Sequence, residues 1–165
     1  MDNEITVRKA VKADAAALAG LLRQVGKVHS DGRPDIYRSP LTKYDEKAAE
    51  DLIADESAGV YVAECGGTVV GETIFRIMSR EGDGVFLPRK WLYIDDLCVD
   101  ENSRGGGAAL ALVEQTKRIA ENEECDAVEL NCWAFNTRAA RFYEKAGFRP
   151  QKTEYEFPLS AATTI

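Results

Sequence analysis

The sequence is poor in histidine and has no closely spaced cysteines. Its 165 residues include one histidine and four cysteines, at positions 65, 98, 125 and 132, none of which form a CxxC pair. Zinc sites in proteins combine closely spaced cysteine and histidine ligands, so the usual zinc spacings are excluded and we expect no metal. We expect the cysteines to be free thiols in a reducing compartment.

Long hydrophobic runs and an excess of positive charge are also missing. The longest apolar stretch near the start, Ala15 to Leu22, is too short to span a bilayer and follows charged residues, unlike a signal peptide. We therefore expect a soluble, cytoplasmic protein with no membrane partner. The formal net charge of -7 argues against a nucleic-acid partner and would suit a cationic small molecule.

The chain has the size and composition of one domain, spanning 1–165. It is 45% hydrophobic and has no Pro/Ser-rich linker. Apolar periodicity and turn residues predict strands at 5–11, 60–65, 69–77, 91–99, 128–132 and 154–159, and helices at 15–28, 44–56, 108–122 and 136–147. Asp14 and Asn136 are the expected N-caps, Gly147 the expected C-cap, and Gly66-Gly67 a hairpin turn. The order β-α-α-β-β-β-α-β-α-β predicts an α/β (α+β) fold with a mixed sheet.

Three consecutive glycines, Gly105 to Gly107, lie between a predicted strand and a predicted helix. A glycine-rich turn at a helix N-terminus exposes backbone N–H groups beside the positive end of the helix dipole, which favours binding of a phosphate. The stretch SRGGGAAL matches neither GxGxxG nor a Walker loop. On these residues alone, a phosphate cradle and a flexible helix-entry turn have equal weight.

Two flanking patterns resemble a known family. Arg104-x-x-Gly107-x-Ala109 and the run NTRAARFYEKAGF, from Asn136 to Phe148, look like the two signature regions of the GNAT (Gcn5-related) N-acetyltransferases. The two matches occur in the family's order, and the element order is also that of the family. The resemblance implies the GNAT fold, with a mostly antiparallel central sheet, and acetyl-coenzyme A as cosubstrate.

The resemblance also implies where the cosubstrate binds. In the family, the pyrophosphate rests on the loop and helix N-terminus that correspond to Arg104 to Ala109, and pantetheine lies along the strand that ends in LCV. The implied cofactor-binding residues are Leu97, Cys98, Val99, Arg104, Gly105, Gly106, Gly107, Ala108, Ala109, Asn136, Ala139 and Tyr143.

Acetyl transfer to an amine favours a base and an acid. A lysine-like amine, with a pKa of about 10.4, costs roughly 4.6 kcal/mol to deprotonate at pH 7. Tyr143 matches the tyrosine that protonates the leaving thiolate in many family members.

Asp95 and Asp96 lie inside an apolar strand, where two acids are costly to bury, and they resemble the acidic pair of spermidine/spermine-type acetyltransferases. We favour Asp95 as the base, with a water relay; the two acids can face one cleft only if a β-bulge intervenes.

The acceptor site is expected in the segment HSDGRPDIYR, from His29 to Arg38, which is predicted to be a loop. His29, Asp35, Tyr37 and Asp96 are the candidate substrate-binding residues. Surface or capping roles are the alternative for His29, and a solvated turn is the alternative for Asp35. Trp133 is interpreted as a core residue.

The sequence therefore predicts an acetyl-coenzyme A-dependent N-acetyltransferase that acts on a primary amine by direct attack in a ternary complex. A small cationic amine is the first expected acceptor and a peptide or protein amine the second. A non-catalytic acyl-coenzyme A-binding sensor module is the alternative from another class. A homodimer is compatible with the resemblance, with the C-terminal strand and its Pro158 as the candidate interface.

Overall fold

The computed structural model describes residues 4–39 and 45–159. Five strands form one sheet in the order β1-β2-β3-β4-β5. The first four pair antiparallel with their neighbours, and β4 pairs parallel with β5. The strands are β1 (Ile5–Lys9), β2 (Gly59–Cys65), β3 (Thr68–Arg80), β4 (Arg89–Val99) and β5 (Ala127–Glu129).

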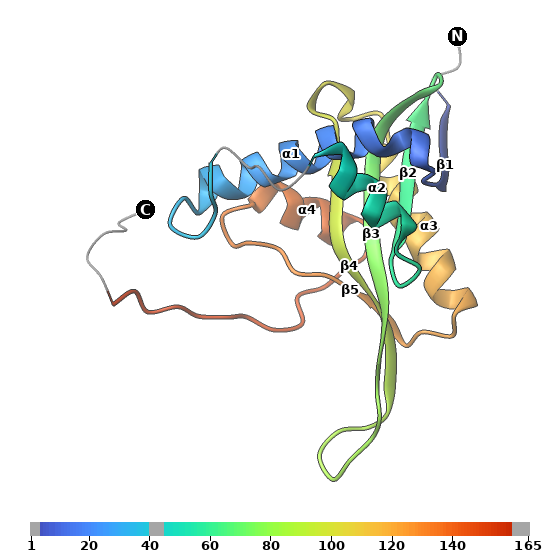
Figure 1. Cartoon of the computed structure of the whole chain (residues 1–165). Helices are drawn as coiled ribbons and strands as arrows, with labels where there is room; N and C mark the ends of the chain where they lie inside the picture. Colours follow the sequence, from blue (N-terminus) through green and yellow to red (C-terminus); the bar gives the residue numbers. More distant parts are fainter. Residues whose placement is uncertain (1–3, 40–44, 160–165) are drawn as a thin grey trace.

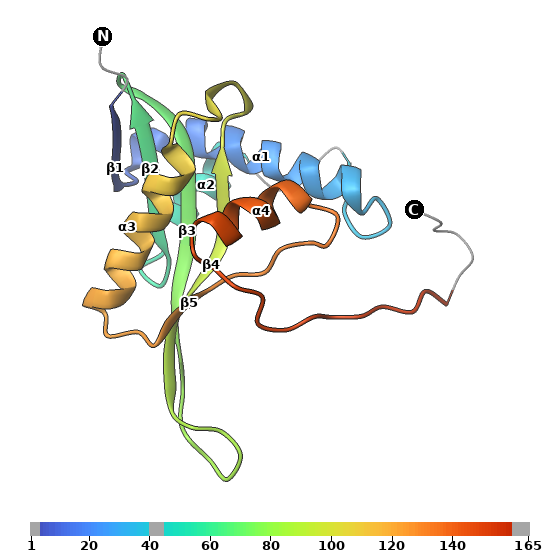
Figure 2. The same cartoon turned by 180° about the vertical axis from the view of Figure 1, so that it is seen from behind.

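Helices cover both faces of this sheet (Figures 1 and 2). On one face lie α1 (Ala15–Gly32), which follows a short 3-10 turn at Lys12–Asp14, and α2 (Glu46–Ala54). On the other face lies α3 (Ala108–Asn122), which follows a second 3-10 turn at Glu101–Ser103, while α4 (Thr137–Lys145) lies beside the open end of β4. Lys117 of α3 donates a hydrogen bond to the Ala146 carbonyl at 2.7 Å, which ties the end of α4 to α3.

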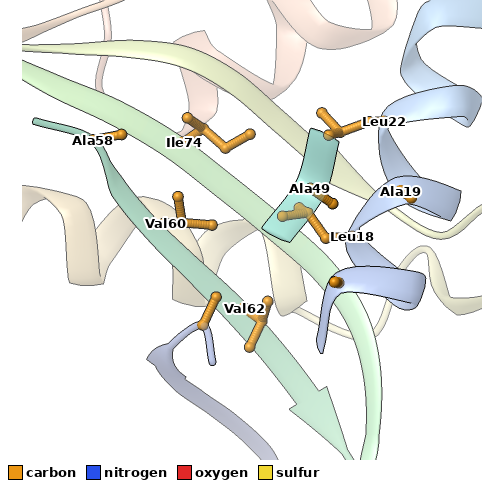
Figure 3. Packing of buried hydrophobic residues seen from close by; sticks show 10 residues of the cluster. Leu18, Ala19, Leu22, Ala49, Ala58, Val60, Val62 and Ile74 are labelled. Atoms are coloured by element: carbon orange, nitrogen blue, oxygen red, sulfur yellow. The ribbon is translucent and has the colours of Figure 1, made fainter. Parts of the chain in front are cut away.

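The hydrophobic core is divided between the two faces of the sheet. Figure 3 shows the cluster in which Leu18 and Leu22 of α1 pack on Val60, Val62 and Ile74 of the central strands. A second cluster joins Val70, Ala63 and Leu112 on the α3 face. Burying one such aliphatic side chain contributes roughly 1.5–3 kcal/mol, so both layers hold the sheet rigid beneath the loops.

The predicted end of the first helix is wrong, and its predicted N-cap, Asp14, is confirmed in position only. The helix does not end near Val28 but continues to Gly32, so His29 is helical, and it stops just before Pro34, whose ring disfavours helical geometry at Arg33. Asp14 does not cap α1 with its side chain. Its carboxylate instead accepts hydrogen bonds from Arg8 at 2.7 Å and from the Val11 backbone N–H at 2.8 Å.

The second predicted helix is shorter than expected. It begins at Glu46, and the Asp45 side chain accepts a hydrogen bond from the Ala48 N–H at 2.8 Å. Tyr44, the predicted first residue, lies outside the described residues. The helix ends at Ala54, because Asp55 adopts an extended backbone and its carboxylate binds the turn at Ser57.

The predicted strands at 128–132 and 154–159 also need correction. Strand β5 ends at Glu129, so Leu130 to Cys132 are not part of it, and residues 154–159 form no strand. A strand needs a partner for its backbone, and the described part of the chain offers none to this segment, which runs away from the sheet (Figure 1). The other predicted elements and the mixed α/β fold class are confirmed.

The β3–β4 hairpin is longer than the sequence indicated. Strand β3 continues past Ile77 to Arg80, and β4 begins at Arg89, so the hairpin extends as an arm beyond the sheet (Figure 1). The turn predicted at Gly66-Gly67 is confirmed: both glycines have positive φ, of 56° and 81°. Gly147 follows α4 with φ 92°, as expected of a C-cap glycine.

Candidate functional site

The parallel pair β4–β5 separates after three residue pairs. Trp91, Leu92 and Tyr93 of β4 pair with Ala127 to Glu129, and beyond Tyr93 strand β4 pairs only with β3. The edge of Leu97-Cys98-Val99 that faces away from β3 therefore carries backbone N–H and C=O groups without a strand partner. Such an edge can bind an extended ligand through main-chain hydrogen bonds, as an added strand does.

A β-bulge lies on β4 at its acidic pair. Ile74 pairs with Asp96 and the next residue, Phe75, pairs with Ile94, so Asp95 is the extra residue. A bulge breaks the strict alternation of side chains along a strand. The β-bulge that would allow both aspartates to approach one cleft is therefore present.

The two aspartates have different surroundings. The Asp95 carboxylate lies 3.4 Å from the Arg76 guanidinium, and its side chain is 42% exposed. Asp96 is more enclosed: burial raises the pKa of its carboxyl to about 7, the Leu97 backbone amide opposes this, and the charge of Asp95 adds to the increase. A carboxylate with such a pKa is better matched to proton transfer near neutral pH than an ordinary one.

Tyr143 is placed by the capped start of α4. The Asn136 side chain accepts a hydrogen bond from the Ala139 N–H at 3.2 Å, as the sequence predicted. One turn later, Tyr143 packs edge-on against Phe142 and Phe148, with ring centroids 5.4 and 5.7 Å away. Burial raises the pKa of Tyr143, and the charges of Cys132, Asp96 and Glu72 add to this. The phenol therefore stays protonated at neutral pH, and the charges of acids on β3 and β4 act on it.

The glycine run adopts the geometry of a helix-entry cradle. Gly105 and Gly107 have φ of 85° and 88°, and Gly107 is the N-cap of α3. An added Cβ would meet no atom within 4 Å at either position, so their surface is open. Gly106 and Arg104 are exposed beside them, Ala108 is buried and Ala109 is half-buried. The described residues thus fit a phosphate group at the N-terminus of α3.

Replacing Gly107 by alanine tests this geometry. Because an L-residue disfavours the left-handed region, we expect a loss of about 1 kcal/mol in the free energy of unfolding and weaker acetyl-coenzyme A binding. Gly20→Ala in α1 is the matched control, since Gly20 has open space around it and no positive φ, and there we expect unchanged binding. Denaturant unfolding and calorimetric titration measure both effects; equal results for the two variants would contradict the cradle.

Of the predicted acceptor residues, His29 and Tyr37 lie together at the end of α1, whereas Asp96 lies on β4. The His29 and Tyr37 rings are 5.1 Å apart, and the Tyr37 hydroxyl accepts a hydrogen bond from the Trp133 Nε1 at 3.2 Å. Burial lowers the pKa of His29, so its imidazole is neutral at pH 7. Trp133 is not a core residue as interpreted from the sequence: it is half-buried and stacks on Phe135 at 6.1 Å. An aromatic wall therefore joins the α1 end to the loop before α4.

Asp35 is engaged within its own loop. Its carboxylate accepts hydrogen bonds from Arg33 at 2.9 and 2.7 Å, and the Arg33 guanidinium holds the pKa of Asp35 below its usual range. Arg33 also binds Glu156 and lies 5.2 Å from the centre of the Trp133 ring. This ion pair orders the loop and leaves Asp35 less available to an acceptor than Asp96.

Sequence reasoning missed one buried acid. Glu72 of β3 is completely buried and pairs in register with Cys98. Its only sequence signal is a charged residue inside the apolar run VVGETIF. The neighbouring Cys98 thiol is unreactive as a nucleophile, since burial raises its pKa to about 12.

Neither a metal-binding group of side chains nor a membrane-spanning helix is found within the described residues. In the ranges 4–39 and 45–159, no group of three or more histidine, cysteine or acidic side chains is arranged to hold a metal ion. No helix within those ranges is both long and apolar enough to cross a membrane.

Comparison with known proteins identifies the family. Residues 28–148 match the model of the acetyltransferase (GNAT) family, which covers most of the chain. The BH1408 protein from Bacillus halodurans, solved as a tetramutant, is 32% identical and superposes with a TM-score of 0.88 over 93% of this chain and 99% of that one. The chain therefore belongs to the GNAT family of acetyltransferases, and the predicted family and fold are confirmed.

Relatives of known activity are more distant. An aminoglycoside N(6')-acetyltransferase type 1 from Klebsiella pneumoniae is 27% identical over 156 residues, 92% of this chain and 77% of that protein. The mycothiol acetyltransferase of Beutenbergia cavernae is 28% identical over 102 residues, 57% of this chain. The match spans only 34% of that relative's length. These relatives are named for acetyl transfer to different acceptors, so they support the class of enzyme and not one acceptor.

Proposed function

We propose that the protein transfers the acetyl group of acetyl-coenzyme A to the primary amine of a small cationic acceptor, by direct attack in a ternary complex. The proposal is supported by Asp96 on the open edge of β4 and by Tyr143 of α4, which lies near enough for the charge of Asp96 to raise its pKa. A base for the amine and an acid for the leaving sulfur thereby flank the strand that the family uses for pantetheine.

The residues that would hold the cosubstrate fall into two groups. The glycine loop and the first turn of α3 fit the phosphates, and the backbone of Leu97-Cys98-Val99 fits the pantetheine arm. Bound acetyl-coenzyme A supplies the thioester, an activated acyl group that an amine can attack without a covalent enzyme intermediate. Asn136 and Ala139 act through the α4 cap, which fixes where Tyr143 lies.

The chain's own residues would then perform two proton movements. Asp96, rather than the Asp95 favoured from the sequence, removes a proton from the acceptor ammonium, because its raised pKa matches this task and Asp95 is held by Arg76. Tyr143 donates its phenolic proton to the departing thiolate. The aromatic wall of Tyr37 and Trp133, with His29 beside it, borders the acceptor.

Release of free thiol from acetyl-coenzyme A tests the proposal. The panel contains polyamines, aminoglycosides, amino acids and lysine-ended peptides. We expect turnover with small cationic amines. Turnover with peptides alone would move a peptide or protein amine to first place, and tight acetyl-coenzyme A binding without any turnover would favour the non-catalytic binding module.

We further propose that the protein is a homodimer through its C-terminal segment. Tyr155, Phe157 and Leu159 alternate along an extended stretch and are 91%, 85% and 95% exposed. This is the pattern of one face of a strand, and three large apolar side chains in a row are seldom left in water. A groove beside β5 and α4, lined by Tyr93, Asn131 and Tyr143 among others, is open at that edge, and a second copy could supply the strand that covers it.

A chain that ends at Lys152 tests the dimer. We expect the full chain to elute as a dimer in size-exclusion chromatography with light scattering, and the shortened chain as a monomer. The double variant Tyr155→Ser, Phe157→Ser should weaken the dimer without shortening the chain, because it removes apolar contact area only. A full-length chain that is monomeric at high concentration would contradict this proposal.

A further inference from the structure

Glu72 is a buried acid to which the proposed mechanism gives no role. It is 0% exposed, and within the described residues neither carboxyl oxygen accepts a hydrogen bond of good geometry; only the backbone amide of Cys98 is near enough to lower its pKa. A buried carboxylate without partners is strongly unfavourable, so a fold that retains one needs either a proton on it or a cation near it. Whether Glu72 carries a proton or has a cation nearby depends on what is bound beside it.

The neighbours of Glu72 place it beside the reaction. Cys98 lies opposite Glu72 in the β3–β4 ladder, and Asp96, two residues back along β4, is the diagonal neighbour on the same side of the sheet. Tyr143 of α4 lies near enough to both acids that their charges oppose its ionisation. Thr73 donates its hydroxyl to the Asp96 carbonyl at 3.2 Å, which fixes the two strands at this point.

The charge state of this pair follows from its burial. Burial raises the pKa of Glu72 well above its usual range, the charge of Asp96 raises it further, and the Cys98 backbone amide opposes both only in part. The pKa of Asp96 is raised to about 7, with Asp95 contributing. At neutral pH and without a bound cation, the two carboxyls therefore hold at least one proton between them, and the residual negative charge lies on Asp96, the less buried of the two.

We propose that Glu72 and Asp96 form the subsite for the acceptor's ammonium group, and that this acid pair releases a proton when the cation binds. The inference rests on the proposed function, because it identifies the position of the reacting amine. Asp96 is half-buried and can contact the cation. Glu72 is buried beside Asp96 in the sheet and acts on the cation only through its charge. Glu72 is thus a positioning residue, and Asp96 is the group that touches the acceptor.

The proton balance is simple. The pair holding one proton and one negative charge meets R–NH₃⁺, the cation favours the ionised form of both carboxyls, and one proton leaves to solvent. The pair then carries two negative charges, one of which takes a proton from the ammonium as the amine attacks. A neutral amine would not drive this ionisation, so the subsite selects acceptors that arrive protonated.

Calorimetric titration of the protein in the presence of coenzyme A tests the proposal without turnover. The probes are spermidine, 1,3-diaminopropane and kanamycin, each titrated at pH 7 in phosphate and in Tris buffer. The dependence of the heat on buffer ionisation enthalpy counts released protons, and we expect roughly half to one per cation bound. Release should be clearly smaller in Glu72→Gln, which keeps the shape of the side chain, because only Asp96 then remains to lose a proton.

Glu64→Gln is the matched control. Glu64 is a carboxyl on the neighbouring strand β2 that pairs with Arg8 at 2.9 Å and is not part of the proposed acid pair. We expect this variant to release as many protons as the unmodified protein. The proposal is overturned if none of the three probes binds, if binding exchanges no proton, or if Glu72→Gln releases as many protons as Glu64→Gln.

A second measurement needs no ligand. A carboxyl that is protonated in the folded protein and ionised in the unfolded chain makes folding less favourable as pH rises above about 4.3, the ordinary value for glutamate. Between pH 5.5 and 8.5, the Tm of the unmodified protein should therefore fall relative to that of Glu72→Gln. A constant difference would show that Glu72 is not protonated and would overturn the proposal.

The two proposals fail in different ways. If no amine is acetylated but cations bind with proton release that depends on Glu72, the acetyl-transfer function fails and the cation subsite stands. If amines are acetylated and no proton release occurs, the function stands and the subsite fails. Should Glu72→Gln not fold, Asp96→Asn replaces it in both measurements, with loss of proton release as the expected result.

Discussion

Tyr143→Phe is expected to lower kcat by about 10²- to 10³-fold while the affinity for acetyl-coenzyme A changes little. The substitution removes one hydroxyl and keeps the ring that packs on Phe142 and Phe148. General acid catalysis contributes on this scale, and a thiolate that leaves without a proton is the worse leaving group. Because burial raises the pKa of Tyr143, the phenol remains a proton donor across the neutral range.

The control for this change is Tyr61→Phe. Tyr61 lies on β2 and stacks on Phe75 at 5.8 Å, so it is a partly buried tyrosine in the same sheet but away from the open edge of β4. We expect its kinetics to match those of the unmodified protein. Steady-state rates of thiol release measure both variants. Equal activity of Tyr143→Phe and Tyr61→Phe would remove Tyr143 from the mechanism.

Asp96→Asn is expected to lower kcat/KM by about 10²-fold or more. It should also abolish the decrease of kcat/KM at acidic pH. In the unmodified protein the base is active when ionised. With the pKa of Asp96 at about 7, kcat/KM should fall about tenfold per pH unit below that value and level off above it. If the bound cation lowers the pKa of Asp96, kcat should begin to fall at a lower pH than kcat/KM does.

The adjacent acid provides the comparison. Asp95→Asn makes the same chemical change one residue away, in a side chain that is 42% exposed and contacts Arg76. We expect a loss of less than about tenfold, since an exposed ion pair contributes little. Profiles of rate against pH for both variants decide between them. If only Asp95→Asn abolishes the decrease of kcat/KM at acidic pH, Asp95 is the base, as favoured from the sequence.

Local sequence signals predicted much of the scaffold because their causes are local. The Gly66-Gly67 turn, the Asn136 cap and the Gly147 C-cap each depend on residues within one turn of chain, and all three form as expected. The same holds for the glycine run before α3, where two residues need a left-handed φ. The family signatures then assigned the cosubstrate to this loop and to the strand before it.

Errors arose where the outcome depends on partners outside the element itself. Asp14 stands at the predicted N-cap position, yet its carboxylate binds Arg8, on the strand before it, and not the helix. The segment 154–159 has the alternation of a strand, but a strand forms only against a partner, and no neighbour in the described chain supplies one. Residue alternation alone therefore could not place it.

The sequence by itself determined the family, the order of the elements up to α4 and the left-handed turn before α3, because these follow from short motifs and local backbone preferences. Only the tertiary structure decided which acids meet. The register of β3 against β4 brings Glu72 and Asp96 to one side of the sheet, where their charges reach Tyr143 of α4. Burial then sets their protonation, and burial is a property of the packed fold that no single stretch of sequence specifies.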